Sequence, residues 1–100
     1  MEVVLSQRGE VLHEGHPRWN ERAIQDLVAR LKKIRRGDQP PAQTVLNRLN
    51  SWRGDFLPET VRWAFGEGGL LVAAWWPGEW DCCGGEEWIL FPAAEVREDV

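Results

Sequence analysis

The chain has 100 residues, a formal net charge of −4 and an apolar fraction of 43%, which is the size and composition of one folded domain. We therefore expect residues 1–100 to form a single domain. No apolar run reaches the roughly 18 residues that a membrane span needs, and the N-terminus lacks the basic start and apolar stretch of a signal peptide. Two cysteines exclude a disulfide framework. These limits predict a cytoplasmic protein that does not bind membranes.

The charge is distributed unevenly along the chain. Residues 1–54 carry ten Lys/Arg and six Asp/Glu, a balance of +4, whereas residues 55–100 carry two and ten, a balance of −8. Seven tryptophans and no tyrosine accompany this asymmetry. A strong difference in charge between two halves of a chain indicates charged partners.

The N-terminal residues predict a β-hairpin followed by a loop. Glu2–Leu5 and Glu10–His13 are short strand patterns, and the turn between them ends in Gly9, where a positive φ is expected. After a loop over residues 14–20, Asn20 is expected to cap a helix. Trp19 and Ile24 would then pack together across the start of that helix.

Two helices are predicted in the middle of the chain. Residues 21–36 carry an apolar stripe at helical spacing, with Gly37 at its end. A second helix is expected from Asp38 to Arg53, with two prolines in its first turn and Gly54 after its end. Because the connection between them is short, we expect the two helices to be neighbours in space.

Three strands are predicted after the helices. Residues 60–65 alternate between apolar and polar, and residues 70–76 and 88–91 are apolar runs. Short links indicate an antiparallel meander, with a turn at residues 66–69 and a loop at residues 77–85. The predicted fold class is α+β in the order ββααβββ, with two helices packed on an antiparallel sheet.

The last two strands are apolar on both faces, although antiparallel sheets usually keep one face wet. Helices that share one face would leave the other open. We therefore expect an apolar interface on the sheet, with a homo-oligomer as one outcome.

Aromatic and acidic residues gather around the predicted loop at residues 77–85. Tryptophan is common among interface anchors, and carboxylates beside it suit a basic protein surface. We therefore predict a small non-enzymatic protein-binding module, a regulator or inhibitor that docks on a larger assembly, including one that handles nucleic acid. The expected binding residues are Trp76, Glu79, Trp80, Asp81, Glu86 and Glu87.

An alternative is a nucleic-acid-binding protein of helix-turn-helix type. Two helices joined by a short turn fit that outline, and amide, hydroxyl and guanidinium groups can read base edges. The candidate residues are Arg36, Gln43, Thr44, Asn47, Arg48 and Ser51. The balance of −8 over residues 55–100 opposes phosphate binding, so nucleic acid ranks second.

A small zinc-binding domain is the other alternative. His13, His16, Cys82 and Cys83 are the ligand types that zinc prefers, but adjacent cysteines do not have the spacing of a structural site. Carboxylates around Cys82 and Cys83 would raise a thiol pKa and weaken the nucleophile. We therefore expect no catalytic residue, no cofactor and no bound metal.

Overall fold

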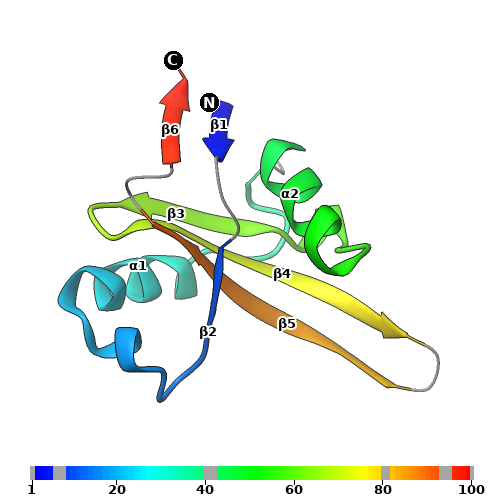
Figure 1. The fold of residues 1–100 in the computed structure, drawn as a ribbon, viewed down its shortest axis with the longest axis horizontal. Helices are drawn as coiled ribbons and strands as arrows, with labels where there is room; N and C mark the ends of the chain where they lie inside the picture. The colour runs from blue at the N-terminus through cyan, green and yellow to red at the C-terminus, as the bar shows by residue number, and fades with distance from the viewer. Residues whose placement is uncertain (1, 6–8, 40–42, 80–81, 93–95, 100) are drawn as a thin grey trace.

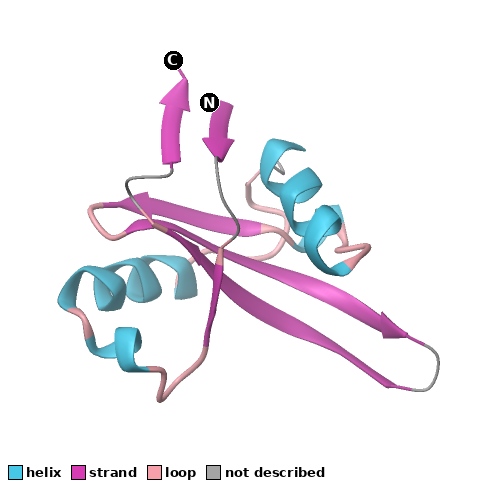
Figure 2. Ribbon diagram, viewed as in Figure 1, coloured by secondary structure: helices cyan, strands magenta, loops and turns pink. Residues whose placement is uncertain are grey.

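A computed structural model describes residues 2–5, 9–39, 43–79, 82–92 and 96–99. Its centre is a four-stranded antiparallel sheet in the order β2-β5-β4-β3, together with two helices (Figures 1 and 2). This confirms the α+β class, the element order and the C-terminal meander. The elements are β1 Glu2–Leu5, β2 Glu10–Leu12, α1 Arg22–Lys32, α2 Gln43–Arg53, β3 Arg62–Gly66, β4 Gly69–Glu79, β5 Cys82–Phe91 and β6 Val96–Asp99.

The two helices cover opposite faces of the sheet, as Figure 1 shows. Helix α1 buries an apolar stripe that includes Leu27 against Leu71 and Ala73, on what we call the α1 face. Helix α2 buries Leu49 against Val72 and Ala74, on the opposite face, which we call the α2 face. The two clusters share no residue. The expectation that the helices are neighbours was therefore wrong.

The same arrangement explains why the central strands are apolar on both faces. Successive side chains of a strand point to opposite faces, and here each face has its own helix. Leu70–Ala74 and Ile89–Leu90 are fully buried within one copy of the chain. The expected uncovered face at the centre of the sheet is thus covered, and the reason for expecting an interface there falls away.

The predicted N-terminal hairpin is not formed. Strand β1 pairs with β6, and β2 pairs with β5, both antiparallel. Gly9 is not among the glycines with positive φ. A Cβ placed on Gly9 would clash with the Ile89 side chain, so glycine is needed here because the chain passes close against β5.

Helix α1 is shorter than its apolar pattern indicates. Residues Pro17–Asn20 form a 3-10 turn, and Glu21 stands at the N-cap position in place of the predicted Asn20. At the other end, the helix stops at Lys32. Ile34 lies beyond this end and still packs against the α1-face cluster, which is why the apolar pattern continues after the helix has ended.

The predicted loop at residues 77–85 is mostly strand. Gly78 pairs with Cys83 and Glu79 with Cys82, so β4 and β5 form one long hairpin. Its outer part extends beyond both helices and beyond β2 (Figure 1). We call residues 75–79 and 82–87 the hairpin arm. Within the described ranges, no helix is long and apolar enough to cross a membrane.

Candidate functional site

A hollow of about 290 Å³ opens where β2 ends beside β5. Leu12, the last residue of β2, lies opposite Trp88, and the chain then turns away through His13 and Glu14. The turn leaves the outer side of β5 open next to Glu87. We call this space the edge hollow. Its lining consists of Val11, Leu12, His13, Glu14, Trp19, Glu86, Glu87 and Trp88.

Two indole rings give the edge hollow an aromatic wall. The ring centroids of Trp19 and Trp88 are 5.7 Å apart, with their planes tilted by 44°. Trp19 comes from the 3-10 turn before α1, and Trp88 comes from β5. Both rings are partly exposed and pack against the α1-face cluster. Because this packing already fixes the two rings, they can present their flat π-surfaces to a ligand with little loss of side-chain entropy.

The carboxylate of Glu86 is the centre of an ion-pair network behind the edge hollow. Its Oε2 lies 2.6 Å from Nη2 of Arg62 and 3.5 Å from Nη2 of Arg36. Its Oε1 accepts a hydrogen bond of 3.0 Å from the indole nitrogen of Trp88. The guanidinium of Arg62 also donates to the carbonyl of Ile34 at 3.0 Å. Glu86 thus connects β5 with β3 and with the segment after α1.

The network sets the charge state of Glu86. Burial alone would raise the pKa of its carboxyl, but the hydrogen bond from Trp88 and the charges of Arg62 and Arg36 outweigh burial and lower the pKa below its ordinary value. Glu86 is therefore ionised at neutral pH. Because its charge is already paired, Glu86 orients Trp88 rather than serving as a free rim charge.

The other residues of the predicted acidic-aromatic surface lie at different places in the structure. Trp76 is partly buried and packs against the α2-face cluster. Glu87 lines the edge hollow. Trp80 and Asp81, and the side chain of Glu79, lie outside the described residues. Of the six predicted residues, the structure therefore brings Glu86 and Glu87 together at one hollow.

The residues of the nucleic-acid alternative do not share a surface. Thr44, Asn47, Arg48 and Ser51 line a shallow hollow on the outer side of α2, and Gln43 donates to Asn47 at 2.8 Å. The guanidinium of Arg36 instead lies 5.0 Å above the ring of Trp75, on the α1 face. Because the helices lie on opposite faces of the sheet, they do not form a helix-turn-helix pair.

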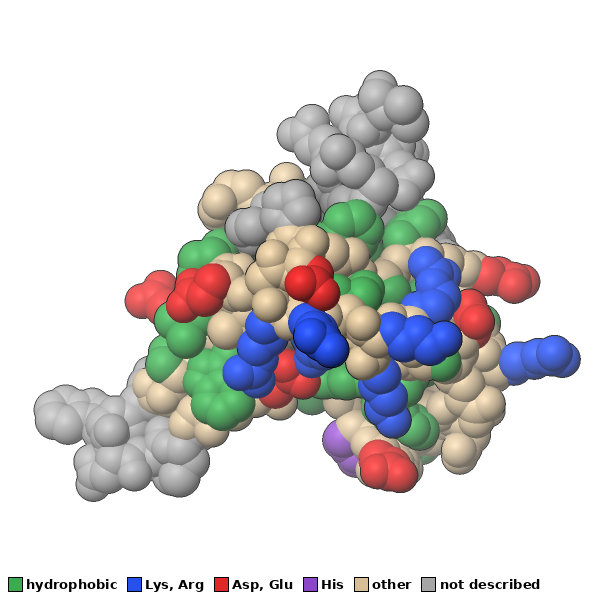
Figure 3. Space-filling model, turned by 180° about the vertical axis from the view of Figure 1, so that it is seen from behind, with side chains coloured by type: hydrophobic (Ala, Val, Ile, Leu, Met, Phe, Trp, Pro, Cys, Tyr) green, Lys and Arg blue, Asp and Glu red, His purple; other side chains and the backbone are tan. Residues whose placement is uncertain are grey.

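Basic side chains do gather on another part of the surface. Figure 3 shows Lys and Arg side chains across the face seen from behind. The end of α1 and the residues after it supply five exposed members: Arg30, Lys32, Lys33, Arg35 and Arg36.

The residues of the zinc alternative lie at two separate places. His13 and His16 have ring centroids 5.7 Å apart, beyond the end of β2. Cys83 lies five residues from Trp88 along β5, about 17 Å at about 3.4 Å per residue. Within the described ranges, no three His, Cys, Asp or Glu residues are grouped as metal ligands.

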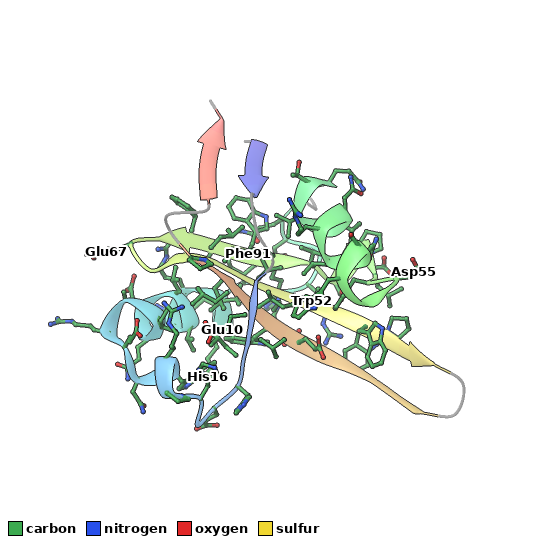
Figure 4. All side chains as sticks on the ribbon, in the orientation of Figure 1. Glu10, His16, Trp52, Asp55, Glu67 and Phe91 are labelled. Atoms are coloured by element: carbon green, nitrogen blue, oxygen red, sulfur yellow. The ribbon has the colours of Figure 1, made fainter. Side chains whose placement is uncertain are left out.

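His16 has structural partners on both ring nitrogens. Its Nδ1 accepts from the backbone nitrogen of Arg18 at 3.1 Å, and its Nε2 lies 3.0 Å from Oε1 of Glu10. Figure 4 shows Glu10 and His16 side by side next to β2. These contacts use the nitrogen atoms that a metal would need.

No protein-family model, curated protein or solved structure shows significant similarity to this chain.

Sequence reasoning missed most of the lining of the edge hollow. The sequence pattern predicts that Trp19 packs against Ile24 and that Glu14 lies in a loop. Trp88 was treated only as a buried strand residue. The nearest signal in the sequence is the shortness of the strand pattern at Glu10–His13, because a short strand leaves part of its neighbour's edge open.

Proposed function

We propose that this protein is a non-enzymatic protein-binding module that takes a basic segment of its partner at the edge hollow. The observation that carries the proposal is the combination of two partly exposed indole rings with carboxylates at one opening. A guanidinium or ammonium group gains from both features, through the ring quadrupole and through charge pairing.

The charge around the edge hollow supports a basic partner. Residues 77–87 carry four acidic residues and no Lys or Arg, and Arg36 and Arg62 offset the charge of one of them, Glu86. Glu14 is exposed at the rim. A surface of one sign speeds the approach of a partner of the other sign and disfavours partners of its own sign. The same charge disfavours nucleic acid at this place, since phosphates would be repelled.

A peptide-binding experiment tests the proposal. We expect a library of eight-residue peptides with three arginines each to yield binders, whereas a matched library with three glutamates yields none. Binding is measured by tryptophan fluorescence and by calorimetry. Affinity should fall as the salt concentration rises, because exposed charges are screened.

Charge reversal places the binding at the hollow. Glu14→Lys should weaken binding about 10-fold or more, as expected when a charge pair is replaced by repulsion. Glu67→Lys is the matched control. Figure 4 shows Glu67 in the β3–β4 turn, at the opposite end of the sheet from the hairpin arm. Equal binding of both libraries, or an equal effect of the control, would refute the proposal.

A further inference from the structure

The free edges of the sheet are protected unequally. At the β3 edge, the side-chain amide of Gln39 donates to the carbonyl of Trp63 at 3.1 Å and accepts from its backbone nitrogen at 3.0 Å. One amide group thus takes the place of a neighbouring strand. Arg30 donates to the carbonyl of Phe65 at 2.6 Å, so this second backbone carbonyl on the outer edge of β3 also has a hydrogen-bond partner.

The outer side of β4 beyond β3 is occupied as well. The backbone nitrogen of Trp75 donates to the hydroxyl of Thr60 at 2.8 Å, and the carbonyl of Trp75 accepts from the backbone nitrogen of Leu57 at 3.0 Å. Pro77 follows and has no N–H to offer. Proteins use such devices because an open edge pairs readily with another chain.

The outer side of β5 differs from these edges. Strand β2 pairs only with Trp88–Leu90 of β5, whereas β5 begins at Cys82. Among the residues that the structure describes, no strand pairs with the outer side of residues 82–87. This open stretch runs along the hairpin arm and ends at the edge hollow.

The open stretch has room beside it. A Cβ placed on Gly85 would meet nothing within 4 Å, and Gly85 is not among the glycines with positive φ. Neither packing nor backbone conformation therefore requires glycine there. Glu86 lies on the α1 face and Glu87 on the α2 face, because side chains alternate along β5.

We propose that the partner's basic segment binds as an added β-strand on the outer side of residues 83–87, in line with β2. This inference rests on the proposed function and names its binding mode. Main-chain hydrogen bonds to the open edge supply affinity, as in other cases of strand addition. At the end of the open stretch, the exposed carboxylate of Glu14 at the rim of the edge hollow favours Lys or Arg in the bound segment. The last basic side chain of the segment reaches the indole rings of the edge hollow.

Backbone methylation of the bound peptide tests the binding mode. In an added strand, the N–H groups of alternate residues point to β5 and those between point to solvent. We therefore expect N-methylation of one alternate set in the best arginine-bearing peptide to weaken binding at least 10-fold. Methylation of the other set should change the affinity by less than about 3-fold, with charge and sequence identical in both peptides.

Amide exchange provides a second readout. Bound peptide should slow hydrogen exchange at alternate residues between Cys83 and Glu87, and leave the amides of β3 unchanged. If both methylated sets bind equally while Glu14→Lys still weakens binding, strand addition is wrong and the proposed function stands. If the unmethylated arginine library yields no binder, the proposed function itself fails. Concentration-dependent self-association that competes with the peptide would identify a second copy as the occupant and overturn a separate basic partner.

Discussion

Removing the carboxylate of Glu86 should destabilise the fold strongly. The side chain of Arg62 is only 12% exposed and that of Glu86 only 22%, so the pair lies within the protein. Breaking a buried pair by removing one partner costs about 3–5 kcal/mol. Because Arg62 keeps its hydrogen bond to the carbonyl of Ile34, we expect Glu86→Ala to lie at the lower end, about 3 kcal/mol. For a chain of this length, that lowers Tm by about 12–20 °C.

Urea unfolding and calorimetry measure this loss, with Glu67→Ala as the exposed control. A double variant separates the network from the side chain itself. Replacing Arg62 by Met in the Glu86→Ala background removes the unpaired charge, so it should recover about 1–3 kcal/mol. If Glu86→Ala unfolds within about 1 kcal/mol of the control, Glu86 is a solvated surface charge and our description of the network is refuted.

Three further predictions concern the pKa of Glu86, the amide of Gln39 and the two glycines Gly84 and Gly85. The pKa of Glu86 in the folded protein lies below the ordinary 4.5. The contribution of Glu86 to folding stability is therefore complete above about pH 4.5 and is lost as the pH falls through the folded pKa. Glu86→Gln should flatten this part of the plot of unfolding free energy against pH. Gln39→Ala removes two hydrogen bonds from the β3 edge and should cost about 1–2 kcal/mol in chemical unfolding, with new self-association detected by light scattering. Gly84→Ala would place a Cβ 2.5 Å from the carbonyl oxygen of Trp76, so it should lower the free energy of unfolding by about 1–3 kcal/mol. Gly85→Ala should leave that free energy unchanged or raise it by up to about 1 kcal/mol. Equal effects of the two variants would contradict the backbone geometry at these glycines.

The elements of this fold could be predicted because their signals are local. The apolar residues Ile24, Leu27 and Leu31 recur at helical spacing and are all buried under α1. The apolar runs of β4 and β5 and the turn between β3 and β4 also carry their signal within a few residues. Periodicity reports which residues are buried, and this part of the prediction is confirmed.

The pairing of β1 and β2 could not be predicted, because it depends on contacts with β6 and β5 at the other end of the chain. A strand as short as Glu10–Leu12 has too few side chains to specify its neighbour. Gly9 looked like a turn residue, although its role is to let the chain pass against Ile89. The helices were assigned to one face because the link between them is short, and the two-sided apolar pattern of β4 was the better guide.

The candidate site was predictable only in part for the same reason. The concentration of acid and aromatic residues after Trp76 identified the region, and Glu87 lies at the hollow. The ion pair that holds Glu86 depends on Arg62, a residue 24 positions before Glu86 in the chain. Gln39 gave no signal at all, because an amide that replaces a strand can be identified only when its backbone partner is known.

The separation of the two helices leads to a last prediction. Ile24→Val in α1 should cost about 0.5–1.5 kcal/mol, and Val45→Ala in α2 about 1–2 kcal/mol, since each removes buried methyl groups. These residues belong to clusters that share no member and lie on opposite faces of the sheet. The double variant should therefore show the sum of the two losses within about 0.5 kcal/mol in urea unfolding. Helices packed on each other, as in a helix-turn-helix pair, would couple the two sites. A coupling energy above about 1 kcal/mol would therefore refute the placement of the two helices on opposite faces of the sheet. The hairpin arm and its open edge extend beyond both helices only in that arrangement.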